Sequence, residues 1–163
     1  MGAAIAREIR IDGPGDGAWI MERVGGTFDP VTDHSFSTLR DHELLGGIVI
    51  GAFVGGSMTA HMAGDDKRWF SRELAWLAFD YAFNQCGCHK LVAAVRADNH
   101  KAIAIDMRGG WQFETVIKDL FAPGVDVVVL GMTRDTCKWL DYRPKQFRSN
   151  YRAPTKALTP GVI

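Results

Sequence analysis

The 163-residue sequence predicts one α/β (α+β) domain with a mixed sheet and helices packed on its faces. Two observations lead to this fold class. The apolar side chains change from a β-like alternation to a helical period at about residue 71 and later change back. Glycine pairs separate these stretches, which gives the order antiparallel strands, helix, strand, helix and closing hairpin.

The first forty residues carry the weakest pattern. A stretch rich in glycine and proline over 12–17 precedes residues 18–24, which favour one or two helical turns. Residues 34–40 alternate weakly and indicate the first strand.

Two more strands are expected over 42–54 and 57–63, because β-rich runs flank the tight Gly55-Gly56 turn. Residues 44–63 carry no charge except one that His61 can gain, and their G-x-x-x-G register is also typical of paired membrane helices. Five glycines and a histidine dilute the hydropathy of this stretch. An antiparallel meander is therefore favoured over a membrane span.

From residue 71 the apolar positions follow a helical period, up to Gly87 at the place of a C-terminal cap. A β-branched run over 90–97 follows. We expect the helix to cross over between this strand and the one at 57–63, which makes the two strands parallel. Asn99 is a favourable N-cap for a second helix over 101–108.

The last elements are a long hairpin over 111–132, whose first half alternates as a half-exposed strand does, and a short helix over 134–140. An exposed hairpin could pair with a second copy, so a homodimer is one expectation. Five basic residues and no acidic ones follow Asp141. Residues 1–142 are therefore assigned to the domain, and residues 143–163 to a basic tail that is expected to be flexible.

The charge balance and the cysteines exclude several classes of protein. The chain has 19 basic and 19 acidic residues, and because five of the basic ones lie in the tail, the domain is mildly acidic. Nucleic acid is therefore an unexpected partner except through the tail. The three cysteines have no metal-ligand spacing, so neither a disulfide framework nor a metal site is predicted. No long apolar run opens the chain, which leads us to expect a cytoplasmic protein without a membrane anchor.

Three motifs lie at the ends of these elements: Asp80-Tyr-Ala-Phe83 with Gly87, the N-x-x-A motif from Asn99 to Ala102, and Gly110-Trp-Gln-Phe113 before an outer strand. Together they resemble the GNAT superfamily of N-acetyltransferases, and within it the branch of the ribosomal-protein alanine N-acetyltransferases. The order of the elements from about residue 36 to residue 133 is similar as well.

The resemblance implies a mixed, mostly antiparallel sheet with helices on both faces, splayed between the two central parallel strands. It implies that the pantetheine arm of acetyl-CoA lies in the splay against Ala60, Met62 and Ala63, with Asn99 and Ala102 as further contacts. The pyrophosphate would lie at the amino end of the helix near residue 71, where free N–H groups favour an anion. The implied activity is transfer of an acetyl group from acetyl-CoA to a primary amine of a protein N-terminus, a lysine or a small molecule. Transfer would be direct, in a ternary complex.

The loop before this helix departs from the family pattern. The family has R-G-x-G-x-G or Q-x-x-G-x-G, whereas this chain reads Asp66-Lys-Arg-Trp-Phe-Ser-Arg72 and has no glycine there. One hypothesis is that the loop still binds CoA through side-chain charge and a hydroxyl, and the other is that it has lost CoA. The W-x-x-R-x-L form of the loop is similar to that of phage and prophage GNAT-like proteins, which favours retained binding. The candidate phosphate contacts are Lys67, Arg68, Ser71 and Arg72.

Trp69 and Phe70 in this loop are expected either to pack over the cofactor or to contact a partner. His61 is the candidate general base, because it lies on the strand that would line the thioester and titrates near neutrality. Asp106 occupies the position of the family's tyrosine acid, and it can donate a proton only if its surroundings raise its pKa. The missing tyrosine and the glycine-free loop favour an alternative, a catalytically silent GNAT-fold module that binds a protein or nucleic acid.

Overall fold

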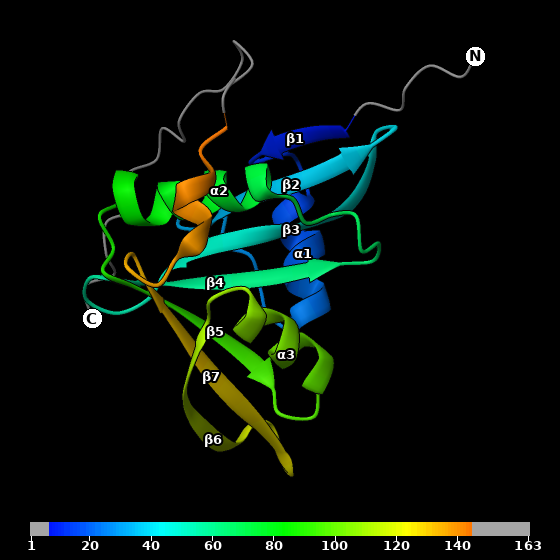
Figure 1. Cartoon of the computed structure of the whole chain (residues 1–163). Helices are drawn as coiled ribbons and strands as arrows, with labels where there is room; N and C mark the ends of the chain where they lie inside the picture. Colours follow the sequence, from blue (N-terminus) through cyan, green and yellow to red (C-terminus); the bar gives the residue numbers. More distant parts are fainter. Residues whose placement is uncertain (1–6, 145–163) are drawn as a thin grey trace.

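The computed structural model describes residues 7–144, which form a seven-stranded sheet of order β1-β2-β3-β4-β5-β7-β6 with helices packed on it (Figure 1). Residues 145–163, and with them most of the predicted tail, lie outside the described residues, and the boundary after residue 142 stays a prediction. The strands are β1 (Arg7–Ile11), β2 (His34–Arg40), β3 (Glu43–Ala52), β4 (Ser57–Gly64), β5 (Lys90–Arg96), β6 (Gln112–Ala122) and β7 (Val125–Thr133). The α-helices are α1 (Asp16–Val24), α2 (Arg72–Asp80) and α3 (His100–Arg108).

The predicted meander is confirmed in strands β2, β3 and β4, which pair in antiparallel register. The turn between β2 and β3 has two residues, Asp41 and His42, with φ of 52° and 67°. Positive φ at both positions is typical of the type I′ turn, whose twist matches that of the flanking strands. Gly55 supplies the positive φ of 58° in the turn between β3 and β4.

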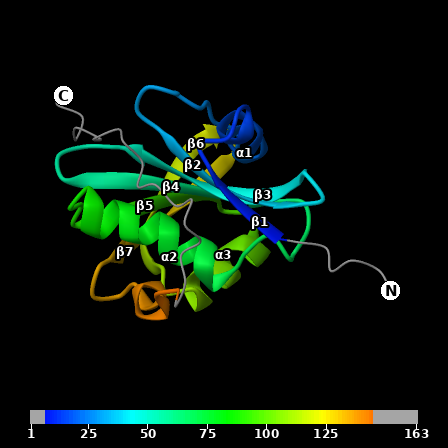
Figure 2. The same ribbon diagram turned by 90° about the horizontal axis from the view of Figure 1, so that it is seen from above.

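The helices cover both faces of the sheet, as Figure 2 shows. On one face, Ile20 and Met21 of α1 bury Val49 of β3. On the other face, α2 packs on the larger core, in which Ile48 and Ile50 of β3 are fully buried. Successive residues of β3 therefore point to opposite helical layers, as the period of a strand requires.

The parallel crossover is also confirmed, since α2 connects β4 to β5 and these two strands pair in parallel. The Ser71 hydroxyl accepts a hydrogen bond of 3.1 Å from the Leu74 amide and caps the start of α2. The helix widens into a π-helical turn at Tyr81–Gln85, where the Cys86 amide donates to the Tyr81 carbonyl at 2.8 Å. Gly87 follows with a φ of 67°.

The structure differs from the expectations at both ends of the described chain. Strand β1 was not predicted; it pairs with β2, and Arg10 on it donates a hydrogen bond of 2.9 Å to the buried Asp16 carboxylate of α1. The prediction that β6 is half exposed is wrong, because its residues 112–121 are exposed on both faces. The short helix is a 3₁₀ turn at Lys138–Tyr142 rather than at 134–140. Within residues 7–144, no helix has both the length and the apolar content needed to cross a membrane.

Candidate functional site

The two central parallel strands separate after a short contact. β4 and β5 pair at three positions, from Ser57 with Lys90 to Thr59 with Val92. Beyond them each strand stays paired with its outer neighbour only, β4 with β3 as far as Gly64 and β5 with β7 as far as Arg96. The facing backbone edges beyond Thr59 therefore have no partner strand, and an extended polar ligand can use their donors and acceptors. The splay that the family resemblance implies is confirmed.

Alternation along β4 places the predicted contacts on two faces. Ala60 and Met62 point to the core beneath α2, and Ala63 packs against the cluster beneath α1. His61 is paired with Val49, which belongs to the α1 cluster, so its imidazole lies on the α1 face. Burial lowers the pKa of His61 below its ordinary value of 6.5, and the nearby Asp33 carboxylate opposes this effect. The imidazole is consequently neutral near pH 7 and can accept a proton.

Asp33 is a functional candidate that the sequence analysis missed. It lies in the loop before β2, and its carboxylate reaches the sheet beside the Thr59 hydroxyl. A Cβ atom on Gly51 would lie 2.6 Å from Asp33 Oδ1, so the glycine makes room for this carboxylate. The Asp29 amide donates to Asp33 Oδ2 at 2.8 Å and holds it in place. Nothing in the sequence marks this contact, because it joins a loop to a strand 18 residues away.

Helix α3 carries the other predicted residues on the opposite face of the sheet. The Asn99 side chain accepts a hydrogen bond of 3.2 Å from the Ala102 amide, which confirms the N-cap. Ile103 packs against the core beneath α2, and Asp106, one turn further along, is half buried on the same side of the helix. Burial raises the pKa of Asp106 to about 6. A raised pKa is the condition under which Asp106 could act as an acid. His61 and Asp106 lie on opposite faces of the sheet.

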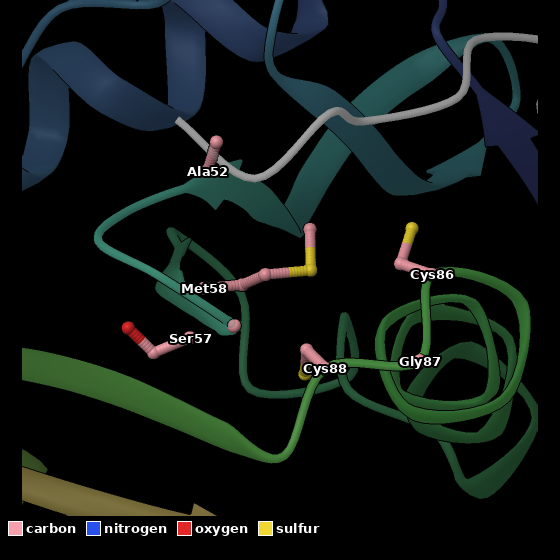
Figure 3. Close-up of a pocket in the computed structure, with 7 residues that line it drawn as sticks. Ala52, Ser57, Met58, Cys86, Gly87 and Cys88 are labelled. Atoms are coloured by element: carbon pink, nitrogen blue, oxygen red, sulfur yellow. The ribbon is translucent and has the colours of Figure 1, made fainter. Parts of the chain in front are cut away.

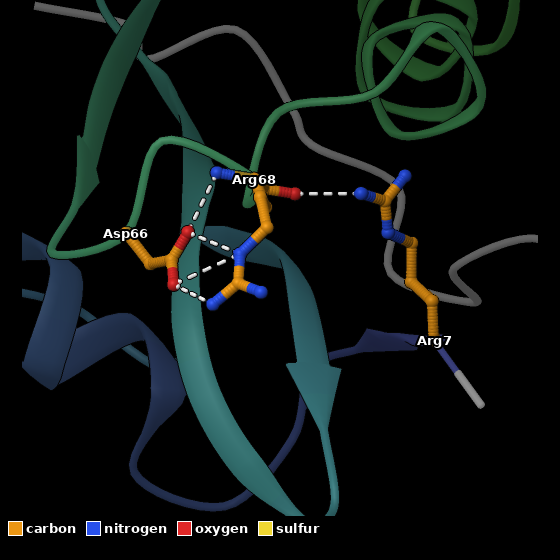
Figure 4. A network of polar contacts seen from close by, with 3 residues as sticks. All are labelled: Arg7, Asp66 and Arg68. Atoms are coloured by element: carbon orange, nitrogen blue, oxygen red, sulfur yellow. Dashed lines mark hydrogen bonds and ion pairs between the residues drawn. The ribbon is translucent and has the colours of Figure 1, made fainter. Parts of the chain in front are cut away.

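The loop over 65–71 joins the carboxyl end of β4 to the amino end of α2 and is tied to three distant elements. Asp65 forms an ion pair of 2.8 Å with Arg23 of α1. The Arg68 carbonyl accepts a hydrogen bond of 2.8 Å from Arg7 of β1 (Figure 4). The Trp69 carbonyl accepts one of 2.7 Å from the Thr38 hydroxyl of β2. These three contacts hold the loop in one conformation.

The basic side chains in and next to this loop differ in their contacts. Both carboxylate oxygens of Asp66 accept hydrogen bonds from the Arg68 guanidinium, and Figure 4 shows the pair side by side. These bonds hold the pKa of Asp66 far below its usual range. The Arg72 guanidinium lies 4.6 Å from the ring centre of Tyr142. Lys67 is exposed, and no ion pair forms on it within residues 7–144.

Trp69 and Phe70 are packed against the protein rather than free in solvent. The Trp69 ring covers Gly64, where an added Cβ would lie 2.1 Å from Trp69 Cδ1. Ring centres are 5.3 Å apart between Trp69 and Phe70, and 5.0 Å apart between Phe70 and Trp139. Trp139 was also missed; its indole N–H donates at 2.8 Å to the Gly109 carbonyl at the end of α3. The aromatic rings therefore connect the loop with the carboxyl end of α3.

A small hollow lies away from the splay, between the β3–β4 hairpin and residues 86–88 (Figure 3). Its volume is about 30 Å³, which is room for little more than water. Cys88 lines it, and burial raises the pKa of this thiol to about 12, so it is a packing residue rather than a nucleophile. No cluster of three metal-ligating side chains occurs among the residues that the structure describes.

Of three comparisons with known proteins, only the one with solved structures found similar proteins. No protein-family model matches the sequence, and no curated protein matches it either. Among solved structures, RimJ of Mycobacterium smegmatis in complex with CoA-disulfide is similar, with a TM-score of 0.53 and 20% identity over 64% of this chain and 54% of RimJ. The chain thus spans about half the length of RimJ.

Two further structures match over nearly their whole length. Mutant forms of the spermidine/spermine N-acetyltransferase SpeG from Vibrio cholerae give a TM-score of 0.63 at 16% identity, covering 85% of this chain and all of SpeG (100%). A protein from Desulfovibrio desulfuricans that is assigned to the GNAT family of acetyltransferases gives 0.61 at 19% identity, covering 78% of this chain and 99% of that one. These likenesses, with the splayed parallel strands, show that the chain has the fold of the GNAT acetyltransferases.

Proposed function

We propose that the protein transfers an acetyl group from acetyl-CoA to a primary amine. The observation that carries the proposal is the splay, because it leaves the backbone edges of two central strands without partners beyond Thr59 and Val92. The two amide groups of a pantetheine arm match such edges in the way that an added strand would. Two proteins with this fold support the proposal: the RimJ structure contains a CoA compound, and SpeG is named as a spermidine/spermine N-acetyltransferase.

The pKa shifts of His61 and Asp106 suit a direct transfer. Neutral His61 on the α1 face would take the proton of the amine as its nitrogen attacks the thioester carbonyl carbon. The C–S bond then breaks, and Asp106 on the α3 face, whose pKa of about 6 leaves part of it protonated near neutral pH, would protonate the departing thiolate. The amine would therefore arrive on the α1 face, where β5 exposes Ala94. The acetyl group passes directly from the sulfur to the amine, without a covalent acyl-enzyme intermediate.

The phosphates of CoA would lie at the amino end of α2. The first amides of this helix point toward an incoming anion, and Lys67 and Arg72 supply positive charge nearby. Backbone donors and side-chain charge would thus replace the glycine-rich cradle. Arg68 is less available for this role because Asp66 already binds its guanidinium.

The alternative is a GNAT-fold module that binds a partner and catalyses nothing. It is favoured by the absence of glycine in the loop and by the packing of Trp69 against Gly64, which fills space beside the strand end. Strand β6 would then be the natural contact surface, since its apolar side chains are exposed. Pairing of β6 with a second copy also stays a prediction, which sedimentation velocity would check.

Calorimetric titration of acetyl-CoA into the whole chain tests the proposal. We expect micromolar binding that weakens at least tenfold in Arg72→Ala, while Lys118→Ala, an exposed residue of the edge strand β6, binds as the wild type does. A second assay follows thiol release from acetyl-CoA in the presence of a polyamine, a lysine-containing peptide and a peptide with a free N-terminus. The absence of binding at millimolar acetyl-CoA would reject acetyl transfer in favour of the partner-binding module.

A further inference from the structure

A second hollow lies near the carboxyl end of β4, on the side of that strand away from β5. Its lining comes from three strands and the loop, through Arg7 of β1, Arg40 of β2, Leu45 of β3 and Arg68. Its volume is about 180 Å³. The strands β1, β2 and β3 all lie on the side of β4 away from β5, and no residue of β5 lines this hollow.

Positive charge exceeds negative charge around this hollow, because three arginines line it. Arg7 and Arg40 are directly opposite each other in the β1–β2 register, where two like charges destabilise a strand pair. The nearby carboxylate of Asp66 is already bound by Arg68 through both of its oxygens (Figure 4). Neither Arg7 nor Arg40 forms an ion pair with any acidic residue between 7 and 144. Three arginines thus line one hollow, and the acidic groups near them are Asp66, which Arg68 binds and which also interacts with Arg40, and Glu43, which is opposite Arg40 in the β2–β3 register.

The geometry around the hollow is held in place before any ligand arrives. Arg7 donates to the Arg68 carbonyl at 2.8 Å, which fixes its guanidinium against the loop. The Arg68 amide donates to Asp66 Oδ1 at 2.8 Å, so the loop backbone is fixed as well. A planar guanidinium group can donate two parallel N–H hydrogen bonds to two oxygens of a phosphate or a carboxylate. Two arginines without an ion pair favour a dianion over a monoanion, and a phosphate monoester has a charge of about −1.5 to −2 at pH 7, whereas a single carboxylate has −1.

We propose that this hollow is a binding site for a phosphate group, held by Arg7 and Arg40 with Arg68 at its floor, and separate from the gap between β4 and β5. Leu45 gives the site an apolar wall, which suits the organic part of a phosphate ester. Two sources can supply the group, the 3′-phosphate of acetyl-CoA or a different phosphate ester. The binding chemistry is the same for both.

The test uses inorganic phosphate as the probe, with acetate as the monoanion control, and compares the wild type with Arg40→Gln and Lys118→Gln. Arg40 is half buried at a strand end, and its substitution removes both the repulsion with Arg7 and the attraction to Glu43, so the variant should fold about as stably as the wild type in buffer without phosphate. We expect phosphate to raise the melting temperature of the wild type and of Lys118→Gln. We expect its dissociation constant to increase at least tenfold in Arg40→Gln. Absence of phosphate binding to the wild type, or equal binding to Arg40→Gln, would overturn the proposal.

Titrations of acetyl-CoA and of its 3′-dephospho form then distinguish the two sources. If the group belongs to acetyl-CoA, Arg40→Gln weakens binding of acetyl-CoA but leaves binding of the dephospho form unchanged. If it belongs to another ester, Arg40→Gln binds acetyl-CoA as the wild type does and loses only phosphate. Binding of inorganic phosphate and binding of acetyl-CoA are measured separately. The proposed phosphate site can therefore be rejected while acetyl-CoA binding is retained, and it can be supported in a protein that does not bind acetyl-CoA.

Discussion

The half-buried carboxyl group of Asp106 should make the protein less stable as the pH rises, and Asp106→Asn should remove this effect. Burial disfavours the charged form, so the folded protein retains the proton up to a pKa of about 6, whereas the unfolded chain releases it near 3.8. Between these values the folded state binds more protons than the unfolded state. The free energy of unfolding therefore decreases as the pH rises through this window.

The size of the effect follows from the two pKa values. Each pKa unit corresponds to about 1.36 kcal/mol, so a rise from 3.8 to about 6 would cost about 3 kcal/mol of folding free energy at pH 8. Asp106 keeps part of its exposure to solvent, which reduces the expected cost to about 2 kcal/mol. Asparagine is close to aspartate in shape and carries no charge. The variant should therefore be more stable than the wild type at pH 8 and similar to it at pH 4.

Urea denaturation at several pH values between 4 and 8 measures this difference. With a slope of about 1–3 kcal/mol per M urea, we expect the midpoint of Asp106→Asn to be roughly 1 M higher than that of the wild type at pH 8. The matched control is Asp98→Asn, since the exposed Asp98 is paired with Arg96 and its pKa is lowered rather than raised, so this change should not stabilise the protein. A difference between Asp106→Asn and the wild type that stays constant with pH would refute the reasoning. If Asp106 is also the acid of the reaction, the acetyl-transfer rate of Asp106→Asn should be at least about 10²-fold lower than that of the wild type.

Two other substitutions test the site and its support. His61→Gln should lower the transfer rate by about 10²-fold and remove the loss of rate on the acid side of the pH profile, because the lowered pKa of His61 places that loss below pH 6.5; an unchanged profile would exclude His61 as the base. Gly46→Ala should destabilise the protein by about 1–3 kcal/mol in urea, because the added Cβ would lie 2.6 Å from the Ala63 carbonyl oxygen. Gly26→Ala, whose Cβ meets the flexible end of Met21, is the control and should cost less.

Local chemistry explains which parts of the fold could be predicted. The Asn99 cap is confirmed because its partner, the Ala102 amide, is three residues away in the sequence. The turn at Gly55-Gly56 and the crossover between β4 and β5 are confirmed because glycine pairs and a change of period mark them in the sequence. The splay itself was predicted from the family resemblance and not from the residues.

The parts that were missed depend on distant contacts. β1 has only five residues and exists as a strand because β2 offers it a free edge. The alternation in β6 suggested a covered face, yet no element between residues 7 and 144 covers it. Of the candidate site, the position of His61 on β4 could be read from the sequence, but the burial that raises the pKa of Asp106 comes from packing that no local pattern reveals.

The three ties of the loop over 65–71 have a consequence for the energetics of ligand binding. Arg23, Arg7 and Thr38 each hold a different point of the loop, so its backbone freedom is lost during folding and not when a ligand arrives. Binding at the end of β4 then carries little ordering cost, and affinity reflects contacts alone. The same ties mean that a substitution on β2, such as one at Thr38, can change affinity at the end of β4 through the loop alone. Strands β1 and β2 therefore support the binding loop as well as forming part of the sheet.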